Sequence, residues 1–210
     1  MEAFIEYFKQ YKILFIILFV LLIILVVVYS KMGKSMSRRK AEKEKLIKKL
    51  DHMKKIREDY ASLTEEKILS DDGENLIEGI ADNIQVRLEK TEDMNSSFEK
   101  LSEEEKMIYA FHYFLDEASA KPSSFFRDFT KPLTPIALSA CEKFIRKEVL
   151  ISVKELYDCY DEDNETASVI PEKINALDEK ITASDFIAEA KEKAVKYIKE
   201  NASCFIAENS

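Results

Sequence analysis

Apolar positions along the chain begin with one unbroken run, residues 13–29, in which the Tyr29 hydroxyl is the only polar side-chain group. This run has 17 residues, and a helix needs about 17–25 apolar residues to cross a bilayer. Aromatic residues flank it at Phe8, Tyr11 and Tyr29, as is typical at membrane interfaces. The pattern predicts a single transmembrane helix over about residues 8–30, within an N-terminal anchor of residues 1–30.

A cleaved signal peptide is the alternative for this segment, since Val28-Tyr29-Ser30 loosely fits a cleavage site. Signal peptides carry a positive N-terminal region and an apolar stretch of about 7–15 residues. Here Glu2 and Glu6 balance Lys9 and Lys12, and the apolar run is longer. We therefore favour an uncleaved span.

The next segment, residues 31–60, is predicted to be a basic juxtamembrane helix. Its apolar residues recur at steps of four, three, three and four, which is one stripe of a helix: Leu46, Leu50, Met53, Ile56 and Tyr60. Residues 31–57 hold 12 Lys/Arg against 3 Asp/Glu, a net charge of +9. Lys and Arg resist translocation, so we expect the N-terminus outside and the rest of the chain in the cytoplasm, as a single-pass cell-membrane protein.

Three interpretations of the basic helix stay open. It lies on anionic lipid, where each basic residue near the surface contributes about 1 kcal/mol; it forms a homo-oligomer through residues 38–60; or it is a solvated stalk. The candidate lipid contacts are Arg38, Arg39, Lys40, Lys48 and Lys49. Beside a membrane span, topology and lipid explain this charge better than nucleic acid does, so no direct nucleic-acid binding is expected.

After a linker at residues 61–71, residues 72–210 are predicted to form one compact all-α domain. The whole chain has only 3 Gly and 4 Pro, and amphipathic stripes of helical period follow one another. Ser102 and Glu105 have the spacing of a capping box, and Thr134-Pro135 resembles an N-cap with Pro at the first helical position. The expected helices include residues 76–88, one from Ser102, one from Thr134, 147–159 and 184–205.

The charge of this half is strongly acidic. Residues 58–210 hold 18 Lys/Arg against 35 Asp/Glu, a net charge of −17. An acidic surface favours a basic protein partner, although it also keeps proteins soluble. Cys141, Cys159 and Cys204 are odd in number and lack a C-x-x-C pair, which indicates free thiols in a reducing compartment.

Catalytic chemistry has little support in the sequence. The chain holds only two histidines, His52 and His112, and neither H-E-x-x-H nor G-x-S-x-G occurs. We therefore expect no enzyme and no catalytic, cofactor-binding or metal-binding residues. The less favoured alternative is an enzyme or calcium sensor around His112, Glu117 or residues 161–165.

The calcium alternative rests on the spacing of four carboxylates. Asp161, Asp163, Glu165 and Glu172 fall at positions 1, 3, 5 and 12 of an EF-hand loop. The sharp turn of that loop needs Gly at position 6, where this chain has Thr166. A solvated loop is therefore the favoured interpretation.

Two stretches carry a family resemblance. Residues 101–117 and 123–129 show an acidic helix start, then Glu117, Phe125 and Phe129 at characteristic positions. They resemble the C-terminal domain of bacterial DNA-mimic proteins, a widespread helical domain, and the similarity covers roughly residues 72–206. The resemblance implies an acidic surface that occupies the basic site of a DNA-binding protein.

The chain departs from that family at the motif itself. Ser123 and Ser124 stand where the family has two glycines, and Arg127 stands where it has Gln. The motif positions to follow in the structure are therefore Glu117, Ser123, Ser124, Phe125 and Phe129. The sequence predicts a non-enzymatic, membrane-anchored interaction domain, with DNA mimicry as the alternative.

Overall fold

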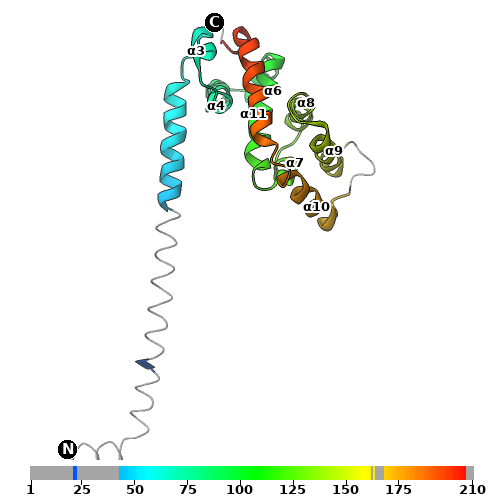
Figure 1. Ribbon diagram of the computed structural model, residues 1–210. Coiled ribbons are helices and arrows are strands. Elements are labelled where there is room, and N and C mark those ends of the chain that lie inside the picture. The colour runs from blue at the N-terminus through cyan, green and yellow to red at the C-terminus, as the bar shows by residue number, and fades with distance from the viewer. Residues whose placement is uncertain (1–20, 23–42, 162, 164–167, 207–210) are drawn as a thin grey trace, which may run out of the picture. The chain divides into compact units, whose positions relative to one another are not determined.

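The computed structural model describes residues 21–22, 43–161, 163 and 168–206 of the chain (Figure 1). Every regular element in these residues is a helix, which confirms the all-α prediction for them. The predicted span, about residues 8–30, lies outside the described residues except for Leu21 and Leu22. Among the helices that are described, none has the length and apolar character needed to cross a membrane.

The chain divides into two compact units, residues 1–54 and 55–210. The second unit therefore begins within the predicted juxtamembrane helix, earlier than the domain start expected at residue 72. A described helix runs over residues 43–59, so the boundary between the units falls inside one continuous helix.

The predicted apolar stripe of that helix changes character along its length. Leu46, Leu50 and Met53, which belong to the first unit, are 45–57% exposed. Ile56 and Tyr60, which belong to the second unit, are 3% and 6% exposed. The stripe thus contributes to the domain core only where the second unit supplies apolar neighbours.

The second unit continues through a series of short helices (Figure 1). These are α3 (Glu65–Ser70), α4 (Leu76–Glu89), α5 (Met94–Glu99), α6 (Glu103–Ala118), α7 (Pro122–Asp128), α8 (Leu133–Phe144), α9 (Lys147–Tyr160), α10 (Pro171–Thr182), α11 (Ile187–Glu200) and the 3-10 helix η1 (Ala202–Phe205). The expected linker, residues 61–71, contains α3, and Ile68 of α3 is fully buried. This segment is therefore part of the core.

Local sequence signals explain where several helices begin. Thr64 caps α3, and Asp93 caps α5, each accepting a backbone N–H bond in the first turn. The predicted capping box of α6 is present: Ser102 Oγ accepts from the Glu105 N–H at 3.1 Å, and Glu105 Oε2 accepts from the Ser102 N–H at 3.0 Å.

Two predicted boundaries were wrong. Helix α8 begins at Leu133, so Thr134 lies inside its first turn and caps nothing. The Ile136 N–H, which an N-cap at Thr134 would satisfy, donates instead to the Pro132 carbonyl at 3.4 Å. The helix predicted over residues 184–205 is divided into α11 and η1 at Asn201.

Helix α6 organises the core, with α4, α7 and α8 packed against it (Figure 1). Its fully buried Phe111 and Phe114 face Phe144 of α8 and Phe125 of α7, with ring centroids 5.0 and 5.6 Å apart. Aromatic pairs of this geometry add about 0.5–1.5 kcal/mol beyond the area they bury. The C-terminal Phe205 is 1% exposed, so η1 also closes the core.

The start of the second unit packs closely on α4. A Cβ atom at Gly79 would lie 2.3 Å from Cγ of Tyr60, a distance that real contacts do not reach. Glycine at this position therefore allows the Tyr60 ring to lie against the helix backbone. The ring is fixed from its other end, because the Tyr60 hydroxyl donates to Asp71 at 2.6 Å.

Candidate functional site

The acidic charge of the domain is concentrated in residues 58–105, which we call the acidic segment. It holds 16 Asp/Glu against 4 Lys/Arg, a net charge of −12, and covers α3, α4, α5 and the first turn of α6. Eleven of these 16 carboxylate residues are exposed: Glu58, Asp59, Glu65, Glu66, Asp72, Glu74, Glu89, Glu92, Asp93, Glu99 and Glu103. Most of the domain's net negative charge therefore lies at its N-terminal end and faces solvent.

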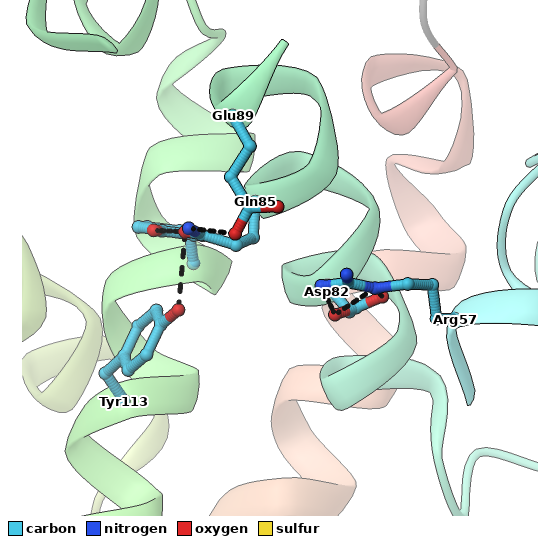
Figure 2. A network of polar contacts seen from close by, with 6 residues as sticks. Arg57, Asp82, Gln85, Glu89 and Tyr113 are labelled. Carbon is cyan, nitrogen blue, oxygen red and sulfur yellow. Dashed lines mark hydrogen bonds and ion pairs between the residues drawn. The ribbon is translucent and has the colours of Figure 1, made fainter. Parts of the chain in front are cut away.

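Arg57 joins the end of the 43–59 helix to α4 through Asp82 (Figure 2). Its Nη2 donates to Asp82 Oδ1 at 3.0 Å, and its Nε donates to Oδ2 at 3.2 Å. Such a two-pronged guanidinium–carboxylate pair fixes orientation as well as distance. The hydrogen bond and the charge of Asp82 raise the pKa of Arg57.

Gln85 links α4 to α6 (Figure 2). Its Nε2 donates to Glu89 Oε1 at 2.9 Å. Its Oε1 accepts a hydrogen bond from the Tyr109 hydroxyl and a longer one, at 3.5 Å, from the Tyr113 hydroxyl. Burial raises the pKa of Tyr109, so its phenol stays protonated and acts as a donor. The amide of Gln85 thereby holds one exposed carboxylate in a defined place.

A second connection runs from Arg87 to the start of α6. Arg87 Nη2 contacts Oε1 of Glu105, whose other oxygen belongs to the capping box with Ser102. Glu105 is 6% exposed, so the guanidinium compensates a buried carboxylate. Together these bonds hold the acidic helices α4 and α6 in a fixed arrangement.

Three of the family-motif positions, Ser123, Ser124 and Phe125, lie in α7, and Ser123 makes a buried structural contact. The Ser123 backbone N–H and hydroxyl donate to the two carboxylate oxygens of Asp178 in α10, at 2.8 and 2.6 Å. Ser123 is 1%, Ser124 7% and Asp178 7% exposed. The sequence did not indicate Asp178, because this residue lies 55 residues from Ser123 along the chain and no local pattern links residues so far apart.

The aromatic motif positions lie in the same region. Phe125 is fully buried, and its ring centroid lies 5.0 Å from that of the half-buried Phe129. Glu117 lies in the last turns of α6, where its carbonyl accepts from the Lys121 N–H at 2.8 Å. The motif thus forms the packed junction of α6, α7 and α10.

The predicted lipid contacts divide between described and undescribed residues. Lys48 and Lys49 are exposed on the 43–59 helix, whereas Arg38, Arg39 and Lys40 lie outside the described residues.

The candidates for catalysis or metal binding are placed as follows. His112 is half-buried in α6 with its ring 5.3 Å from that of Tyr113, and burial lowers its pKa. Asp161 Oδ1 lies 2.9 Å from Lys131 Nζ, which Asp163 also contacts. Within the part of the chain that the structure describes, no group of three or more His, Cys, Asp or Glu could hold a metal ion.

Comparisons of the chain with models of known protein families, with curated proteins and with solved structures each found no match. The resemblance to DNA-mimic proteins therefore stays a prediction carried by the motif residues alone.

Proposed function

We propose that this chain is a bacterial membrane-anchored interaction protein whose cytoplasmic acidic domain binds a basic protein partner and catalyses no reaction. The observation that carries the proposal is the acidic segment, where a net charge of −12 falls within 48 residues and 11 of the 16 carboxylate residues are exposed. Charge concentrated on one part of a surface attracts an oppositely charged partner and orients its approach.

The bonds beneath this surface support the proposal. Arg57 holds Asp82 and Gln85 holds Glu89 (Figure 2). Arg87 holds Glu105 at the start of α6. A surface that is already ordered loses less conformational entropy on binding. The helices that carry the exposed carboxylates are therefore held in place before a partner binds.

Anchoring rests on the sequence. The apolar run of residues 13–29 precedes a segment with a net charge of +9 over residues 31–57, and basic residues remain on the cytoplasmic side. Protease treatment of spheroplasts tests this orientation. Protection of the domain until the membrane is opened is the expected result, and cleavage in intact spheroplasts would contradict it.

The binding proposal is tested by capturing partners from a membrane extract with the full-length protein. A variant in which four exposed carboxylates of the acidic segment become amides should lose most of the captured basic protein: Glu65→Gln, Glu66→Gln, Asp72→Asn and Glu74→Gln. Binding of the wild-type protein should weaken as salt is raised, because salt screens exposed charges.

A matched control removes the same number of exposed charges outside the acidic segment: Glu148→Gln, Glu155→Gln, Glu172→Gln and Glu179→Gln. This variant should retain the partner. The proposal would be contradicted if the amount of captured partner did not depend on salt concentration, or if it fell equally in both variants.

DNA mimicry is the second candidate, and the motif positions at α7 are the observation that favours it. Duplex DNA added to the captured complex should then displace the chain from its partner in proportion to the DNA concentration. If the captured partner binds no DNA, the proposal of DNA mimicry fails and that of a basic protein partner remains.

A further inference from the structure

A pocket of about 160 Å³ lies between the end of α7, the connection to α8 and the end of α9. Its volume is close to the ~150 Å³ of an apolar cavity that holds one benzene ring. The residues that line it come from these separate segments: Phe126, Arg127, Phe129, Thr130, Lys131, Thr134, Tyr157, Tyr160 and Asp161.

The aromatic walls of this pocket are held in place by other rings. Phe126 is 5% exposed and meets Tyr157 edge-on, with centroids 5.7 Å apart. Phe129 packs between Phe125 and Tyr113, at 5.0 and 5.5 Å. Edge-on and offset contacts are the preferred geometries between aromatic rings, so a single ring entering the pocket meets walls that are already formed.

The charged groups that line the pocket already contact groups of opposite charge, and Lys131 contacts two carboxylates, Asp161 and Asp163. Lys131 Nζ lies 2.9 Å from Asp161 Oδ1, and the Asp161 side chain is 19% exposed. Arg127 Nε lies 2.7 Å from Asp128 Oδ1. The lining therefore offers N–H donors and a carboxylate acceptor together.

This pairing selects against a charged ligand. An anionic group would have to compete with Asp161 and Asp163 for Lys131, and a cationic group would have to compete with Lys131 for the two carboxylates. A hydroxyl or a primary amide both donates and accepts hydrogen bonds, so it satisfies the pair without leaving a charge uncompensated.

We propose that this pocket binds an uncharged, single-ring aromatic molecule that carries a hydroxyl or carboxamide group. The ring lies against Phe126, Phe129 and Tyr157, and the polar group lies at the Lys131–Asp161 pair. This inference is independent of the proposed partner binding, which uses residues 58–105.

Calorimetric titration of the full-length protein in detergent tests the ligand class. Phenol and benzamide are the neutral probes, while benzoate and benzylamine are single-ring probes of opposite charge. The neutral probes should bind with a Kd of about 1 mM or lower, as a ligand of this size permits. The charged probes should bind at least about tenfold more weakly. Equal binding of all four probes would overturn the proposal.

A variant that fills the mouth separates pocket binding from absorption of the probes by the detergent. Thr130 is exposed, so Thr130→Trp should abolish saturable binding while the protein stays folded. Thr91→Trp adds the same side chain at an exposed position outside the pocket lining and should bind phenol as the wild type does. Saturable binding that persists in Thr130→Trp would overturn the proposal.

A second variant tests the role of the charged pair. Lys131→Met leaves Asp161 without its cation, so the pocket should then favour benzylamine over phenol, reversing the wild-type order. Unchanged selectivity in this variant would show that Lys131 and Asp161 do not contact the ligand, and would overturn the proposed orientation.

Discussion

Ser123 donates both its backbone N–H and its hydroxyl to the carboxylate of Asp178, which joins the start of α7 to the middle of α10. All of these groups are buried. Asp178→Ala should lower the free energy of unfolding by about 3 kcal/mol, because it leaves two buried donors without an acceptor. Urea denaturation of the full-length protein in detergent measures this loss.

Ser123→Ala removes one of the two bonds and should cost less, about 1–2 kcal/mol. The double variant should then lose clearly less than the sum of the two single losses, as expected for residues in contact. Additive losses would show that the bonds contribute little to stability.

The contact between Tyr60 and Gly79 gives a second prediction. Gly79→Ala should destabilise the domain by about 1–3 kcal/mol, because the added methyl group would overlap the Tyr60 ring. Combining it with Tyr60→Leu should recover part of that loss, since the leucine leaves space for the methyl. A stable Gly79→Ala protein, with an unchanged melting temperature, would contradict this packing.

A third prediction concerns pH. Burial lowers the pKa of His112, with Glu78 and Asp116 opposing the shift. The unfolded chain therefore takes up a proton near pH 6.5 that the folded protein does not. The stability supplied by neutral His112 should be complete above that pH and fall on acidification towards the lowered value, with a slope of at most about 1.4 kcal/mol per pH unit.

The variant His112→Gln should flatten this slope on acidification below pH 6.5 in urea denaturation experiments. Carboxylates with a lowered pKa, such as Asp128 and Asp161, lose their stabilising charge only below about pH 4, near their unfolded values. An identical pH dependence in wild type and variant would exclude this role for His112.

The cysteines give a fourth prediction. Cys141 is fully buried, and burial raises the pKa of its thiol well above the ordinary value, whereas Cys204 is partly exposed. Because the thiolate is the reactive form, iodoacetamide should modify Cys204 first in the native protein. Peptide mapping by mass spectrometry measures the order, and in urea all three cysteines should react alike.

The helices that the sequence predicted best are those with a long apolar stripe. Ile80 and Ile84 of α4, and Phe111 and Phe114 of α6, recur at helical spacing, and all four are buried. Helix α3 has six residues with one buried side chain, Ile68, too short for a period to appear. Its place in the core comes from tertiary packing, which a local pattern does not encode.

The candidate sites were harder to predict, because their geometry joins distant segments. The excess of acidic residues was visible in the sequence. The hydrogen bond between Gln85 and Tyr109, however, depends on which sides of α4 and α6 face each other. The pocket brings Lys131 to Asp161, and the pairing of Ser123 with Asp178 likewise spans separate helices. No spacing rule connects such residues in a single chain.

The burial of Ile56 and Tyr60 has a mechanical consequence. Any tension applied to the chain before residue 55 enters the folded domain first through these two side chains and the Arg57–Asp82 pair. The force then reaches α4, the helix that bears Gln85 and Glu89. A pull on the N-terminal end would therefore load the acidic segment before the remote α9 and α10.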